Sequence, residues 1–167
     1  NGSADEAVDF YRKAAVLRPD DLTIQEEMAR AQIAAGKPLD ALRVLERLTR
    51  DPELRDRADL QRLLGEIYLK TDRPHEARDL FMKLTRQDKN DSEAWLMLGE
   101  ASWALGDELG ALTAARHAIK NNPQLAKAYI LAGLIFQKRN ELKHATEMFE
   151  LAAAHAPDDA TPRILQG

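Results

Sequence analysis

The stretch SEAWLMLGEASWALGDELGALTAARHAIKNNPQL, residues 92–125, carries the pattern that decides the fold. Its apolar residues recur three and four positions apart in two runs, and Gly106 stands between the runs. This spacing places the apolar side chains of each run on one face of an α-helix. Glycine tolerates the left-handed conformation that ends a helix. The stretch therefore predicts two helices joined by a tight turn at Gly106.

The same pattern returns every 34 residues in both directions from this stretch. A glycine recurs in the first helix, an alanine in the second helix and a proline near the end of the unit. These columns are Gly65, Gly99 and Gly133; Ala77, Ala111 and Ala145; Pro123 and Pro157. A fixed period in this range is typical of a solenoid, in which each unit buries its apolar face against its neighbours. The glycines and alanines are expected to let helices approach closely.

The period divides the chain, residues 1–167, into a single array. Four full repeats are predicted, and we name them the first to the fourth repeat: 22–55, 58–91, 92–125 and 126–159. Residues 1–21 match the second half of a repeat, and residues 160–167 match the start of another. The turns inside the four repeats are predicted at Gly36, Asp72, Gly106 and Asn140.

Two features of the array are expected from its ends and its connections. Neither end has the polar face of a capping helix, so we expect a fragment of a longer array. Its exposed apolar ends, at Tyr11 and at Ile164–Leu165, would favour self-association. Asp21 is expected to cap the helix that follows it. Because Pro52 arrives early, we expect the next helix to begin there, with Asp51 as its cap.

The columns resemble those of the tetratricopeptide repeat family. The matching positions of the third repeat are Trp95, Leu98-Gly99, Gly106, Ala111, Ala118 and Pro123, and those of the fourth are Tyr129, Gly133, Phe136, Ala145, Phe149, Ala152 and Pro157. The resemblance implies an all-α, right-handed superhelical solenoid of antiparallel helix pairs. It also implies a non-catalytic scaffold for protein–protein interaction, with the first helix of each repeat lining a concave groove.

Composition excludes several classes of function. The net charge is −4, with 24 Lys and Arg dispersed among 28 Asp and Glu, which argues against nucleic acid as a partner. No run approaches the ~18 apolar residues that cross a bilayer, so membrane insertion is not expected. The chain has no cysteine, which excludes disulfides and cysteine-based zinc sites. A soluble protein of the cytoplasm or the periplasm fits equally.

No residues form a catalytic, metal or cofactor motif. The four histidines, His75, His117, His144 and His155, lack the spacing of metal ligands. We interpret them as solvated or partly packed side chains, and we expect no enzymatic activity and no cofactor.

The groove residues follow from helical phase. Trp103 lies eight positions after Trp95, about 80° further round the helix. Trp95 belongs to the packed column and is given no binding role, whereas Trp103 is expected to be partly exposed as an anchor for a protein or peptide. The predicted partner-binding groove comprises Arg62, Glu66, Leu69, Leu96, Glu100, Trp103, Lys127, Ile130, Leu134 and Lys138.

Two alternatives stay open for this apolar groove. The patch of Leu96, Trp103, Ile130 and Leu134 could instead pack against the rest of a larger protein or a further repeat. The whole array could then be a structural spacer or platform within a multidomain protein. A related RNA-binding helical repeat would need a basic groove, and the acidic Glu66 and Glu100 argue against it.

Overall fold

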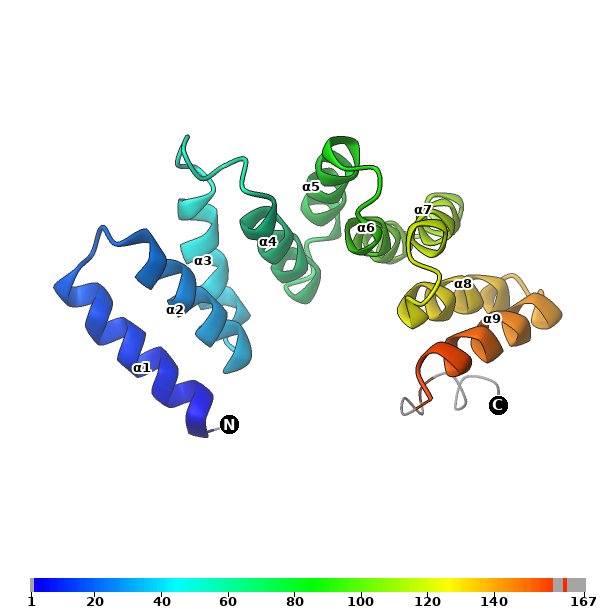
Figure 1. Ribbon diagram of the computed structural model, residues 1–167, viewed down its shortest axis with the longest axis horizontal. Coiled ribbons are helices and arrows are strands. Elements are labelled where there is room, and N and C mark those ends of the chain that lie inside the picture. Colours follow the sequence, from blue (N-terminus) through cyan, green and yellow to red (C-terminus); the bar gives the residue numbers. More distant parts are fainter. Residues whose placement is uncertain (1, 158–160, 162–167) are drawn as a thin grey trace. The chain divides into compact units, whose positions relative to one another are not determined.

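The computed structural model describes residues 2–157 and 161 of the chain (Figure 1). Residues 2–157 form nine α-helices, and no residue of the described part lies in a strand. The helices are α1 (Gly2–Leu17), α2 (Leu22–Ala34), α3 (Pro38–Leu48), α4 (Ala58–Lys70), α5 (Pro74–Gln87), α6 (Ser92–Ala104), α7 (Glu108–Asn121), α8 (Ala126–Lys138) and α9 (Leu142–His155). The all-α prediction is confirmed. None of these helices is both long and apolar enough to cross a membrane.

The chain divides into two compact units, Asn1–Arg73 and Pro74–Gly167. The first unit contains α1 to α4, and the second contains α5 to α9. Within each unit, every helix packs on the helix next to it in the chain. Short connections between packed neighbours make successive helices antiparallel. The boundary between the units falls inside the second repeat.

The first helix of each repeat ends in the same way. The residue at the predicted break has a left-handed backbone, with φ of 71° at Gly36, 57° at Asp72, 76° at Gly106 and 61° at Asn140. The amide N–H of the next residue then donates to the carbonyl oxygen five positions earlier. These bonds run from Lys37 to Gln32, Arg73 to Tyr68, Asp107 to Ser102 and Glu141 to Phe136. Together the two features form a Schellman motif, and the four predicted breaks are confirmed.

Aspartates begin several of the helices. The Oδ1 of Asp21 accepts hydrogen bonds from two amides of the first turn of α2, as predicted. Asp91 accepts from the amide of Ala94 in α6, at 2.9 Å. Such caps satisfy N–H groups that have no partner inside the helix.

The prediction of an early helix at Asp51 is wrong. The Oδ1 of Asp51 does accept from the amide of Glu53, at 2.8 Å. The turn does not continue, however, because Arg57 adopts an extended conformation with ψ of 112°. Residues 51–56 therefore form turns, and α4 begins at Ala58.

Two glycines of the repeated column allow close helix contact, as expected. A Cβ atom at Gly133 would overlap the Phe149 ring, and one at Gly99 would lie 2.8 Å from Cδ2 of Leu131. Real Cβ atoms do not approach their neighbours so closely. Phe149 itself is 1% exposed, so the large ring fills the space that the missing side chain leaves.

The fourth position of the repeat shares a hydrogen bond in all four repeats, although its residue types differ. The fourth residue of every repeat donates a side-chain hydrogen bond to the backbone carbonyl six positions earlier. The pairs are Gln25 with Pro19, Gln61 with Arg55, Trp95 with Lys89 and Tyr129 with Pro123. The bond ties the start of each first helix to the turn before it. What recurs at this position is therefore a side-chain donor, and not an aromatic ring.

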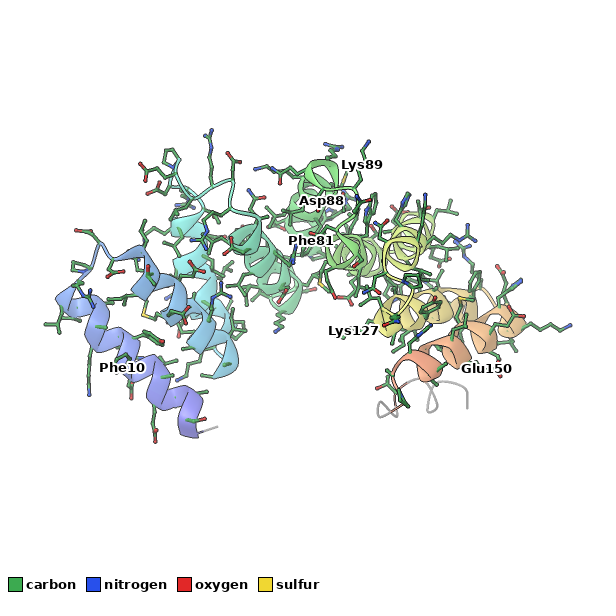
Figure 2. The ribbon with its side chains drawn as sticks, viewed as in Figure 1. Phe10, Phe81, Asp88, Lys89, Lys127 and Glu150 are labelled. Carbon is green, nitrogen blue, oxygen red and sulfur yellow. The ribbon has the colours of Figure 1, made fainter. Side chains whose placement is uncertain are left out.

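The outer face of α1 differs from its prediction. Tyr11 is half-buried, whereas Phe10, Val16 and Leu17 are exposed. Figure 2 labels Phe10 on α1. The predicted apolar end at Ile164–Leu165 lies outside the described residues.

Candidate functional site

Trp103 lies near the end of α6 and is half-buried, as its helical phase predicts. One part of the ring packs against a core of small and aliphatic side chains in the second unit. The members of this core are Leu96, Ala111, Leu112, Ala115, Ala118, Ala128, Leu131, Ala132 and Ile135. The remainder of the ring is left to the surface, so Trp103 combines firm packing with accessible apolar area.

A lysine covers part of the exposed Trp103 ring. The Nζ of Lys138, at the end of α8, lies 4.8 Å from the centre of the ring. A cation over an indole face is attracted by the electron density of that face. Trp103 and Lys138, two of the predicted groove residues, are thus in direct contact.

Glu108 holds Lys138 in this position. Its Oε1 lies 3.0 Å from Nζ of Lys138, and its Oε2 accepts from Nε of Arg139 at 3.1 Å. Hydrogen bonds from Lys138 and then Arg139 are the largest causes that lower the pKa of Glu108 below its ordinary 4.5. The carboxylate therefore stays charged at neutral pH and fixes one edge of the site.

Three further predicted residues lie on the same helix, α8. Ile130 and Leu134 are half-buried, while Lys127 is exposed. Figure 2 shows Lys127 on α8. On α6, Glu100 is half-buried. Helices α6 and α8 contact each other directly, so these side chains belong to one pair of packed helices.

The assignment of Leu96 to the groove is wrong. Leu96 is 0% exposed and belongs to the core that α6 forms with α7 and α8. The reason is that α6 packs against α5, α7 and α8 together. The buried surface of α6 is therefore broader than a single stripe. A position that would face the groove on a helix with two neighbours is buried on α6.

The other predicted groove residues, Arg62, Glu66 and Leu69, lie on α4 in the first unit, where each is half-buried. Elsewhere in that unit the charges form a network. Arg30 donates to Glu26, four residues earlier in α2, at 2.6 Å, and Arg57 donates to both Glu26 and Asp59. The N-terminal part of the chain thus contains charged groups that satisfy one another.

Trp95 is more accessible than its packed column predicts. It is half-buried, and its ring stacks on His117 with 4.3 Å between centres and 17° between planes. It lines a hollow of about 480 Å³ on the second unit. Trp95 also lines a second hollow, of about 470 Å³, together with the small Ser102. Ser102 is the signal that could have found this second hollow, because the second and fourth repeats have Tyr68 and Phe136 at that register.

The histidines are exposed or partly packed, as interpreted. His155 stacks on Tyr129 at 5.4 Å, and His144 lies 3.2 Å from a carboxylate oxygen of Glu141. Within the described residues, no three His, Asp or Glu side chains gather closely enough to hold a metal ion.

Comparison with known proteins agrees with this geometry. A family model described as tetratricopeptide repeat matches residues 27–92 and 64–126, which together exceed half of the chain. No curated protein matches the sequence.

Solved structures resemble the fold at low identity. MamA superposes with a TM-score of 0.79 at 21% identity, over 96% of this chain and 92% of that one. YrrB, described as a tetratricopeptide repeat protein with an unusual peptide-binding site, gives a TM-score of 0.77 at 22% identity, over 98% and 83%. A thermophilic tetratricopeptide repeat protein of Thermus thermophilus gives 0.75 at 21% identity, over 87% and 79%. The repeat motif, the helical-repeat fold and the family match agree: the chain belongs to the tetratricopeptide repeat family.

Proposed function

We propose that the chain is a non-catalytic scaffold that binds a peptide or partner protein against α6 and α8, with Trp103 as the anchor. Tetratricopeptide repeats generally mediate protein–protein interaction through extended binding surfaces. The observation that carries the proposal is the Trp103 ring, which is packed on one side and partly uncovered on the other. Aromatic anchors of this kind dominate the energy of many protein interfaces.

The surroundings of Trp103 favour an amphipathic partner. The half-buried Ile130 and Leu134 extend the apolar surface along α8, and Lys127 and Lys138 add exposed positive charge. A partner segment with apolar side chains along one face and carboxylates beside them would match both features. YrrB, which shares the fold, is described as having a peptide-binding site, and this supports a peptide as one form of the ligand.

Lys138 gives the site a way to respond to a partner. Its ammonium group covers part of the Trp103 ring while Glu108 holds it. A partner carboxylate that attracts the ammonium would uncover more of the indole for apolar contact. Lys138→Ala should therefore enlarge the apolar surface and weaken the response of binding to salt.

The test is quantitative affinity capture from a lysate of the source organism. Wild type, Trp103→Ala and a control, Phe136→Ala, serve as baits. Phe136 is also a half-buried aromatic residue, but it packs on His144 of α9. We expect Trp103→Ala to lose at least one partner that the control retains, with binding weaker by about 2 kcal/mol.

The competing function, a structural spacer, predicts a different result. A spacer would lose no partner when Trp103 is truncated. Thermal melts of all three baits accompany the capture, so that unfolding is not read as loss of binding. If folded Trp103→Ala retains every wild-type partner, the proposed anchor is wrong.

A further inference from the structure

A second apolar surface lies on the second unit, formed by α5, α6 and α7. Two hollows of about 480 and 470 Å³ share Met82, Trp95 and Leu98 as lining residues. We call this continuous surface the trough. Its volumes fall within the ~300–1,000 Å³ of ordinary ligand pockets. Trp103 lines neither hollow, so the trough is separate from the proposed groove.

The floor of the trough is preorganised. The indole N–H of Trp95 donates to the carbonyl of Lys89 at 2.9 Å, and the ring stacks on His117. The polar atom of the ring is therefore satisfied inside the protein, and its remaining accessible surface is apolar. A ligand would meet a fixed hydrophobic floor that does not need to reorganise.

Small side chains keep the far part of the trough open. Ser102, Gly110 and Ala114 line the second hollow. Ser102 stands where the second and fourth repeats have Tyr68 and Phe136. The hollow thus follows from a local departure of the third repeat from its neighbours.

The rim near Trp95 is positively charged. Arg86 and Lys89 line the first hollow, and Arg116 and Lys120 line an adjoining hollow that shares His117 with it. Lys89 lies beside Asp88 in the turn from α5 to α6 (Figure 2). No carboxylate lines these two hollows. Among residues 2–157 and 161, none of the four cations has an ion-pair partner.

The far end of the trough is less basic than the rim near Trp95, because one carboxylate and one guanidinium line it. Asp107 is the acidic residue that lines it, and its Oδ1 already accepts from the amide of Gly110 at 2.9 Å. Arg78 also lines this end, and its buried Nε has no hydrogen-bond partner in the described part of the chain. The guanidinium of Arg78 adds positive charge to this end of the trough.

We propose that the trough binds an acidic segment of a partner protein. A large apolar side chain of the segment would pack on Met82, Trp95 and Leu98, and flanking carboxylates would pair with Arg86 and Lys89. The complementarity is specific to this combination. A nucleic acid would satisfy the cations but would bring no aliphatic side chain to pack on Met82 and Leu98. An uncharged peptide would leave the rim unpaired.

The experiment is a phage-display selection, in which peptides from a random library are selected for binding to the full chain. We expect enriched peptides to have an aromatic residue or leucine beside an excess of Asp and Glu. The affinity of an enriched peptide should fall about tenfold or more in Arg86→Glu/Lys89→Glu, and it should weaken as salt is raised. Thr113→Trp, which places a large ring at the second hollow, should weaken it similarly.

Matched variants separate the trough from general effects. Arg50→Glu/Lys143→Glu makes the same change in net charge at exposed cations that line neither hollow. Thr146→Trp matches Thr113→Trp, because both threonines are exposed and donate to the carbonyl four residues earlier. We expect both controls, and Trp103→Ala, to bind the peptide within about twofold of wild type.

Three results would overturn the proposal. The first is an enrichment without acidic excess, or no enrichment at all. The second is a peptide whose affinity depends on Trp103 and not on Arg86 and Lys89. Such a peptide would bind the groove and not the trough. The third is displacement of the peptide by a single-stranded oligonucleotide that binds the chain equally well.

Discussion

The first helices of the first and fourth repeats, α2 and α8, differ most at positions that share one register. The fifth and ninth residues are Glu26 and Arg30 in α2, but Ile130 and Leu134 in α8. Arg30 donates to Glu26 at 2.6 Å, so the charges of α2 pair within the helix. The apolar pair of α8 is half-buried, and its side chains cannot pair with each other through charges or hydrogen bonds. The same repeat framework therefore supports two kinds of surface. One is polar, with charges that pair with one another, and the other is apolar.

The polar surface is extended by neighbouring charges. Arg57, just before α4, reaches Glu26 at 3.0 Å and also donates to Asp59. Exposed ion pairs of this kind contribute little stability, about 0–1 kcal/mol each. They do consume the hydrogen-bonding capacity of the surface. We expect specificity for a partner to reside in the apolar repeats, while the charged repeat keeps its surface polar.

The largest expected effect tests whether the two regions share their core. Position 24 holds Leu45 in the first repeat and Phe149 in the fourth, with exposures of 0% and 1%. Phe149→Ala should lower the free energy of unfolding by about 3–5 kcal/mol, and Leu45→Ala by about 2–5 kcal/mol. Urea denaturation followed by circular dichroism measures both. A small loss at either position would show that the framework is not shared.

A smaller effect is expected from adding volume at position 20. Ala41 in the first repeat and Ala111 in the third are both 0% exposed. Ala41→Leu and Ala111→Leu should each cost about 1–3 kcal/mol, because the helices cannot separate without losing packing. Lys120→Leu, on an exposed position of α7, is the control and should change the midpoint little. Equal midpoints for Lys120→Leu and Ala111→Leu would contradict the register.

The comparison can be broken by exchanging the surfaces. Ile130→Glu with Leu134→Arg transfers the pair of α2 to α8. Stability should change by about 1 kcal/mol or less, because both positions are only half-buried and the new charges can pair at i,i+4. Partner affinity should fall about tenfold if α8 forms the groove. Isothermal titration with a captured partner, beside a melt, distinguishes this outcome from unfolding.

The fold could be predicted because each repeat contains the same pattern of turn and core residues. Glycine, aspartate and asparagine stand at the same turn position, and all four adopt the same left-handed conformation. Because the pattern recurs in four repeats, a departure at one position of one repeat does not change the predicted fold. The exception was Asp51. Residues 56 and 57 lie between the first and second repeats and add two positions to the 34-residue period, and α4 begins only at Ala58.

The site could be predicted only in part because exposure depends on all neighbours of a helix. Phase alone placed Trp103 correctly at a partly uncovered position. It failed for Leu96, since the packing of α6 on three helices buries a wider face. It also missed the accessible side of Trp95, which lines one hollow together with the small Ser102 and another beside His117.

The smallest expected effect concerns pH and compares one carboxylate from each region. Hydrogen bonds from Lys138 and Arg139 lower the pKa of Glu108 below 4.5, and a hydrogen bond from Arg57 lowers that of Asp59 below 3.8. A carboxyl group with a lowered pKa in the folded state stabilises the protein above its ordinary pKa. That contribution disappears as the pH falls through the folded-state value.

Acidification from about pH 6 to about pH 3 should therefore cost wild type more stability than it costs Glu108→Gln or Asp59→Asn. Glu150→Gln, on an exposed position of α9, is the control and should follow wild type. Urea midpoints at the two pH values provide the measurement. Because both carboxylates are near the surface, the differences should be modest and should shrink at high salt. A Glu108→Gln variant that loses as much stability as wild type would show that the contact with Lys138 does not persist in solution, and Trp103 would then be more exposed than the structure indicates.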